Sequence, residues 1–178
     1  APHLRNAAAR RSEEDYFAPT TMREACSWLE HNHDKDDFFL WVDTFDPHEP
    51  WDPPDYYVDM YNPDYIGQRV TYPQYHPIGS LTDEELHHCR SMYFGEVTMV
   101  DRWIGRLLEQ VDYLGLREDT AVVFMSDHGF LFGEHGFIGK SFIGDGYFEC
   151  LRLYEDIIRL PMMVRMPGQT ESVSVPGL

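Results

Sequence analysis

The chain has 178 residues, 43% hydrophobic and 15% aromatic, a composition that supports one folded domain and argues against disorder. Its 31 Asp and Glu residues outnumber its 14 Lys and Arg residues, so the formal net charge is −17. A surface this acidic repels phosphate backbones and anionic lipid, which excludes nucleic acid and membrane surfaces as main partners. No apolar run in the sequence is long enough to span a bilayer.

The first third of the sequence predicts a helix followed by a strand. Residues 1–17 are charged and rich in Ala and Arg, and we expect them to form a poorly fixed lead-in. Thr21 and Glu24 have the spacing of a capping box, which predicts a helix that continues to Glu30. The apolar run 38–43 then predicts a strand that is apolar on both faces, typical of the interior of a covered, mostly parallel sheet.

Residues 46–80 differ in kind, because they contain seven prolines and many tyrosines. No regular element survives that proline density, whereas the aromatic rings argue against a loose linker. We therefore expect a long, packed excursion over one end of the sheet.

The second half predicts a crossover helix between strands. Thr82 and Glu85 form a second capping box, which begins a helix over 82–114 with one apolar stripe. Apolar segments at 121–125 and 160–164 predict two further strands. The order of elements predicts an α/β fold, with a mixed or mostly parallel sheet and flanking helices.

Polar clusters follow two of the predicted strands, where functional groups gather in open α/β sheets. Asp127 and His128 could both turn toward one divalent cation, although two ligands are too few for a complete site. Lys140 could bring positive charge to a bound anion, and His48 could donate or accept a proton from the opposite wall. Spacing alone leaves the simpler roles open, such as a helix cap for the aspartate or a core position for a histidine.

Several aromatic side chains of the excursion, Trp51 among them, could stack on a sugar or aryl group or could simply pack their own loop. The three cysteines, Cys26, Cys89 and Cys150, are an odd number without close spacing. Such a set does not form a disulfide framework, and it favours a reducing, cytoplasmic compartment over a secreted or periplasmic one.

The order of these signals resembles the sulfatases of the alkaline-phosphatase superfamily. The resemblance covers residues 36–168, and five groups of motifs carry it: Asp46-Pro47-His48-Glu49-Pro50-Trp51, the helix with 93–111, the strand and turn at 122–129, Gly133-Glu134-His135-Gly136 with Lys140, and the closing segments 154–161 and 165–168.

The resemblance implies a role for each candidate residue. Asp127 and His128 match two ligands of a divalent metal ion, usually Ca²⁺, with Mn²⁺ and Mg²⁺ as alternatives. His48 matches the histidine that contacts the sulfate ester and protonates the leaving-group oxygen. Lys140 matches the lysine that binds the sulfate group. His135 is a further candidate for substrate contact.

The sequence also departs from the family pattern. Sulfatases begin with a strand that ends in paired aspartates and carry a Cys-x-Pro-x-Arg or Ser-x-Pro-x-Arg segment, whose first residue becomes the formylglycine nucleophile. None of the three cysteines here stands in that setting. We therefore expect residues 1–178 to be an internal part of a sulfatase catalytic domain, without the formylglycine segment and the C-terminal subdomain, and to be inactive alone.

Two other functions stay open at this point. The same scaffold serves phosphonate monoester and phosphodiester hydrolases, which share the metal, His and Lys arrangement. A non-catalytic module that binds a cation is the alternative from a different class. If the protein is an enzyme, the molecule that it binds is a small anionic ester. Residues 1–178 prepared alone could self-associate through exposed strand edges.

Overall fold

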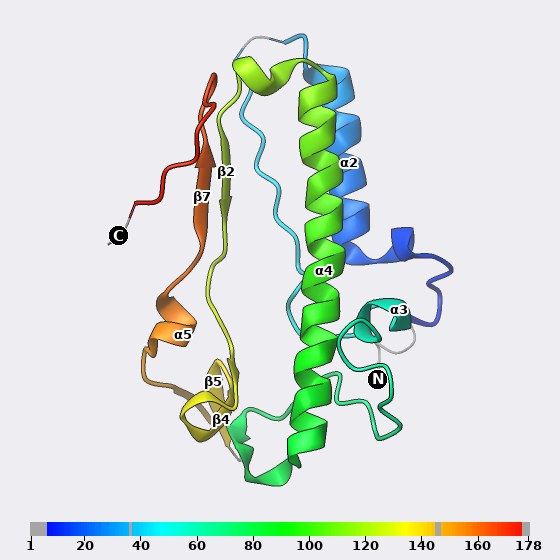
Figure 1. Ribbon diagram of the computed structural model, residues 1–178, viewed down its shortest axis with the longest axis vertical. Helices are drawn as coiled ribbons and strands as arrows, with labels where there is room; N and C mark the ends of the chain where they lie inside the picture. The colour runs from blue at the N-terminus through cyan, green and yellow to red at the C-terminus, as the bar shows by residue number, and fades with distance from the viewer. Residues whose placement is uncertain (1–6, 36, 145–146, 176–178) are drawn as a thin grey trace.

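The computed structural model describes residues 7–35, 37–144 and 147–175. Two long helices, α2 (Phe17–Asn32) and α4 (Asp83–Tyr113), pack side by side along one side of the molecule. The strands β2 (Val122–Met125) and β7 (Met162–Arg165) form an antiparallel pair on the other side (Figure 1). Both helices and strands are present, as the predicted α/β class requires.

Short elements connect these two sides. The excursion contains α3 (Asp55–Val58), β1 (His76–Pro77) and the 3₁₀ turn η2 (Ile78–Ser80). After β2 come β3 (Leu131–Phe132), β4 (Phe137–Gly139), β5 (Ser141–Gly144), β6 (Tyr147–Cys150) and α5 (Glu155–Ile158). The remaining 3₁₀ turns are η1 (Glu13–Asp15), η3 (Leu116–Glu118) and η4 (Glu134–Gly136).

Helix α4 begins where the sequence predicts. The Thr82 hydroxyl accepts a hydrogen bond from the Glu85 N–H at 3.2 Å, and the Glu85 carboxylate accepts one from the Thr82 N–H at 2.8 Å. This reciprocal pair satisfies two backbone donors that the first helical turn would otherwise leave open. The predicted capping box at the start of the long helix is therefore confirmed.

Helix α2 begins earlier than predicted, at Phe17, and the expected capping box of Thr21 and Glu24 does not form its start. The carboxylate of Asp46, which is distant in sequence, accepts a hydrogen bond from the Ala18 N–H at 2.8 Å. A buried acceptor from the excursion thus satisfies a first-turn donor, and the helix can extend one turn further toward its N-terminus.

The described part of the lead-in is tied down, contrary to the expectation of a poorly fixed segment. The Glu13 carboxylate accepts hydrogen bonds from Trp103 Nε1 at 2.6 Å and from Tyr57 Oη at 3.1 Å. Arg10 forms an ion pair with Asp52 at 2.8 Å. These contacts fasten residues 10–15 to α4 and to the excursion.

The apolar run 38–43 is extended but is not a strand, because it has no ladder partner among the described residues. Figure 1 shows this segment running between α4 and β2, in the same direction as β2. Its side chains alternate: Phe39 and Trp41 are 83% and 69% exposed, whereas Leu40 and Val42 are partly buried. The predicted burial on both faces is therefore wrong for this chain.

Every ladder that the structure describes is antiparallel, so the expected parallel pairing is not seen in those residues. Val123 pairs with Val164 and Phe124 with Met163 in the β2–β7 ladder. Helix α4 nevertheless leads from the end of the excursion back to the start of β2, as a crossover helix does (Figure 1). Among the described residues, no helix has the length and apolar character that crossing a membrane requires.

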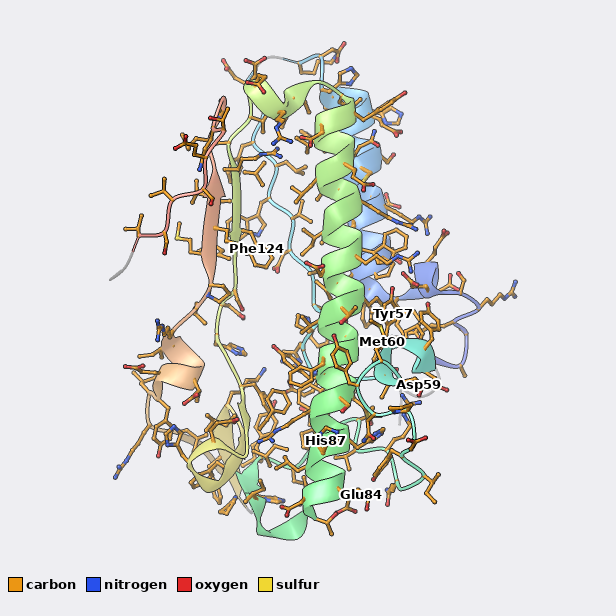
Figure 2. The ribbon with its side chains drawn as sticks, in the orientation of Figure 1. Tyr57, Asp59, Met60, Glu84, His87 and Phe124 are labelled. Atoms are coloured by element: carbon orange, nitrogen blue, oxygen red, sulfur yellow. The ribbon has the colours of Figure 1, made fainter. Side chains whose placement is uncertain are left out.

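The core lies where α4 meets the excursion. One cluster gathers Trp51, Val58, Met92 and Phe132 with further buried residues. A second joins α2, α3 and α4 through Met22, Tyr57, Met99 and Trp103. Figure 2 shows Tyr57 between α3 and α4. Two rings of the excursion, Trp51 and Tyr57, are thus part of the core, whereas Tyr56, Tyr61 and Tyr72 are exposed.

Candidate active site

The structure brings together the side chains of His48 and Lys140, which are 92 residues apart in sequence. His48 lies in the turn that follows the extended segment, and Lys140 follows directly after β4. Their Nε2 and Nζ atoms are 2.7 Å apart. The two candidate residues, which the sequence interpretation placed on opposite walls of a site, are therefore in direct contact.

The neighbours of His48 define its tautomer. Nδ1 lies 2.6 Å from the Glu49 carbonyl oxygen, which can only accept, so Nδ1 carries a proton. The ammonium of Lys140 can only donate, so Nε2 is the acceptor in the 2.7 Å contact. In this arrangement the lone pair of Nε2 is directed at Lys140. The ring of Phe45 packs against it, with centroids 4.5 Å apart.

The carboxylate of Glu49 lies beside both groups. Its side chain is 2% exposed, and Oε1 is 3.6 Å from Lys140 Nζ. Oε2 is 3.5 Å from Nδ1 of His48. The sequence interpretation did not single out Glu49, because nothing in the local sequence indicates that the side chain of this glutamate is buried.

Asp127 and His128 follow β2 in an open turn, where their side chains are 84% and 39% exposed. The N–H of His128 donates to Asp127 Oδ1 at 2.8 Å, which holds the carboxylate over its own turn. Nδ1 of His128 donates to the Gly129 carbonyl at 2.9 Å and leaves Nε2 as a free acceptor, 3.6 Å from Asp127 Oδ2. Two ligand atoms at this separation fit one divalent cation with metal–ligand distances of about 2.0–2.6 Å.

These two ligands do not make a complete site. Among the described residues, no group of three or more His, Cys, Asp or Glu side chains could hold a metal ion. No hydrogen bond or ion pair in the described part of the chain joins Asp127 or His128 to the His48–Lys140 pair. The chain thus supplies two separate pairs of side chains.

Helix α5 braces the turn that carries Asp127 and His128. The N–H of Gly129 donates to the Ile157 carbonyl at 2.8 Å. A Cβ atom at Gly129 would lie 2.0 Å from the Asp156 carbonyl oxygen, so only glycine permits this close approach. Segment 155–158 therefore supports the turn that carries the candidate metal ligands.

His135 lies in the turn between Gly133 and Gly136 with a positive φ of 55°. Its Nε2 contacts Asp156 Oδ2 at 2.9 Å, and its ring stacks on Tyr154 with centroids 3.8 Å apart. The hydrogen bond with His135 lowers the pKa of Asp156. His135 is half-exposed and remains a candidate for substrate contact, now with two neighbours that fix its ring.

Trp51, the other candidate for substrate contact, lies in the core. Its side chain is 1% exposed, and its ring packs against Tyr93, Phe130 and Phe132. Nε1 donates to the Pro47 carbonyl at 2.9 Å. This burial argues against a substrate contact, because Trp51 is needed to hold the turn around His48 against α4.

The chain matches the family model "Sulfatase" over residues 4–176. An arylsulfatase from Clostridium perfringens is 27% identical over 174 residues, covering 87% of this chain and 33% of that enzyme. The chain therefore spans about one third of the length of this relative.

Two solved structures share the fold. A Bacteroides fragilis structure described as the sulfatase yidJ has a TM-score of 0.65 at 25% identity, covering 86% of this chain and 32% of that one. The phosphonate monoester hydrolase of Agrobacterium radiobacter has a TM-score of 0.60 at 21% identity, covering 89% of this chain and 34% of that one.

Proposed function

Because the chain belongs to the sulfatase family, we propose that the protein of which it forms part hydrolyses the sulfate ester of a small anionic substrate. The observation that carries the proposal is the pairing of His48 with Lys140 at 2.7 Å beside a buried carboxylate. A lysine and a histidine so placed can serve the two ends of a sulfate ester, the anionic group and the leaving oxygen.

The residues of this chain act in two steps. Lys140 turns from Nε2 of His48 toward the sulfate oxygens as the ester binds, and its positive charge offsets the charge on the ester. Nε2 is then free to take up a proton from solvent. As the nucleophile, which in this proposal comes from outside residues 1–178, bonds to sulfur, the ester S–O bond breaks and its electrons move to the bridging oxygen, to which His48 passes this proton.

Asp127 and His128 fit a divalent cation by donor type and separation, and we propose that they hold one together with ligands from elsewhere in the protein. Ca²⁺ is the proposed ion, with Mn²⁺ and Mg²⁺ as alternatives. When bound, such an ion supplies Lewis-acid stabilisation of negative charge on the ester and nucleophile. The formylglycine nucleophile, in this proposal, also comes from outside residues 1–178.

The test uses the full-length protein, stripped of metal with a chelator and reloaded separately with Ca²⁺, Mn²⁺ or Mg²⁺. We expect hydrolysis of 4-nitrophenyl sulfate to return with the metal, and the Asp127→Asn variant to lose at least 100-fold in kcat/KM. A matched substitution outside the site, Asp119→Asn, should leave the rate unchanged.

Two other results would replace the proposal. Faster turnover of a 4-nitrophenyl phosphonate monoester than of the sulfate would identify a phosphonate hydrolase on the same scaffold. Binding of the cation by the full-length protein, without turnover of either ester, would identify a cation-binding module.

A further inference from the structure

The burial of Glu49 beside His48 and Lys140 is unusual for a carboxylate. Its side chain is 2% exposed and has lost nearly all contact with water. Burying a charge is costly unless a partner of opposite charge compensates it. Oε1 of Glu49 has no hydrogen-bond partner in the described structure, and its nearest cation is Lys140 Nζ at 3.6 Å. The compensation is therefore one of charge, and a residue of the candidate site provides it.

The second oxygen faces the other candidate residue. Oε2 lies 3.5 Å from Nδ1 of His48, on the side of the ring opposite to the Lys140 contact. The backbone carbonyl of Glu49 accepts the Nδ1 proton at 2.6 Å. One residue thus contacts Nδ1 through its backbone and faces Lys140 and His48 through its two carboxylate oxygens.

Tyr72 lies within electrostatic range of Glu49. Burial and the charge of Glu49 together raise the pKa of Tyr72. Tyr72 stacks on Tyr75, which is 4% exposed, with ring centroids 6.2 Å apart. Because the Glu49 side chain is only 2% exposed, its field acts on His48 and Lys140 with little screening by solvent.

We propose that Glu49 is a positioning residue that orients His48 and Lys140 and offsets their positive charge when Nε2 of His48 is protonated. The inference rests on the proposed function, since it assigns Glu49 a part in the same step. Lys140 and a protonated His48 repel each other even after Lys140 has turned toward the ester, and the buried carboxylate beside both groups offsets their combined positive charge. The backbone carbonyl of Glu49, which accepts the hydrogen bond from Nδ1, also keeps Nε2, and not Nδ1, directed at the ester.

The first experiment compares Glu49→Gln with the wild-type full-length protein, reconstituted with its cation. The amide keeps the shape of the side chain and removes the charge. We expect kcat/KM for phenyl sulfate, whose leaving phenol has a pKa of about 10 as in tyrosine, to fall about 100-fold. For 4-nitrophenyl sulfate, a better leaving group that needs less protonation, we expect a fall of about tenfold or less.

The matched control is Glu96→Gln, the same substitution at a buried glutamate that contacts neither His48 nor Lys140. It should leave the ratio between the two substrates unchanged. Equal losses on both esters in Glu49→Gln, or a loss no larger than that of the control, would overturn the inference in favour of a merely structural role.

A second measurement does not depend on turnover or on the folding of a variant. Imidazole ¹⁵N spectra of His48 in the wild-type protein should show the Nδ1–H tautomer without ligand and the imidazolium when inorganic sulfate is added. An Nε2–H tautomer, or no change with sulfate, would contradict the assignment to Glu49. Failure of the proposed function is distinguishable, because the wild-type protein would then hydrolyse neither sulfate ester whatever the spectra show.

Discussion

Glu96 illustrates how burial can keep a glutamate, which is normally negatively charged at neutral pH, in its protonated form. It lies on α4 with 1% of its surface exposed and accepts a hydrogen bond from the Asp52 N–H at 3.1 Å. Burial, followed by the negative charges of Asp46 and Asp52, raises its pKa to about 9. Burial likewise raises the pKa of Asp46. At neutral pH Glu96 is therefore protonated in the folded chain.

This raised pKa predicts that stability declines with rising pH. The folded state holds a proton that the unfolded state releases near pH 4.5, so the free energy of unfolding falls as pH rises from about 4.5 to about 9. Between pH 5.5 and 8.5 the loss is at most about 4 kcal/mol, because one proton contributes about 1.4 kcal/mol per pH unit.

Glu96→Gln should remove this contribution. Urea unfolding of the wild-type and variant full-length proteins at pH 5.5 and 8.5 provides the measurement, and the variant should gain relative to the wild type at the higher pH. A difference between the two proteins that is the same at both pH values would show that Glu96 is ionised in the folded state.

Sequence reasoning reached His48 and Lys140 but not Glu49, and the reason is physical. The first two belong to residue types and strand-end positions from which chemistry can be expected. The role of Glu49 depends on its 2% exposure, which is created by residues far away in sequence. The two roles that the sequence left open for Trp51 could not be separated for the same reason, because burial decides between a stacking surface and a core ring.

At the level of elements, α5 and the turn after β2 form one unit. The Gly129 N–H bonds to the Ile157 carbonyl, and the Cα of Gly129 lies too close to Asp156 for any side chain. The candidate ligands Asp127 and His128 precede this contact directly. Their placement consequently depends on a short helix that is about thirty residues further along the chain.

Gly129→Ala should displace the turn from α5. The added methyl group would meet the Asp156 carbonyl oxygen at 2.0 Å, so we expect a destabilisation of about 1–3 kcal/mol and at least a tenfold loss of divalent-cation affinity. Calorimetric titration of the metal-free full-length protein measures the affinity.

Gly105→Ala is the matched control for Gly129→Ala. A Cβ atom there meets nothing within 4 Å, and alanine favours the helix by up to about 1 kcal/mol. The control should be at least as stable as the wild type and should bind the cation equally well. Unchanged affinity in Gly129→Ala would show that α5 does not support the ligands.

The sequence predicted the start of α4 correctly but not the start of α2 or the state of segment 38–43, and the difference lies in whether the stabilising contacts are local in sequence. Local signals sufficed for α4, where Thr82 and Glu85 are neighbours in sequence. They failed for the start of α2, because its acceptor Asp46 comes from another segment. They failed again at 38–43, since a strand needs partners and no local pattern supplies them.

For the molecule as a whole, the exposed apolar side chains of the extended segment and of the β2–β7 pair are the main departure from a self-contained domain. Phe39 and Trp41 are 83% and 69% exposed, and Val123 and Met163 are 54% and 59% exposed. Large apolar surface is rare on monomeric proteins and marks a surface that another segment or molecule covers.

We therefore predict that residues 1–178, prepared alone, associate at micromolar concentration. Light scattering should give a mass above that of one chain, and Phe39→Ser with Trp41→Ser should lower it toward the monomer. Ile66→Ser is the control, because Ile66 is 97% exposed and lies in the excursion away from the β2–β7 pair. A monodisperse single chain in the unsubstituted sample would contradict this prediction.

The contact between His48 and Lys140 has a consequence for biosynthesis. The two residues are 92 positions apart, so at 5–20 residues per second a ribosome adds Lys140 about 5 to 18 s after His48. During that interval Glu49 has no cation to accompany it into the interior, and its hydration opposes burial of the turn. Lys140 can therefore compensate the buried carboxylate of Glu49 only after β4 has been synthesised, which predicts that this turn closes late during synthesis of the chain.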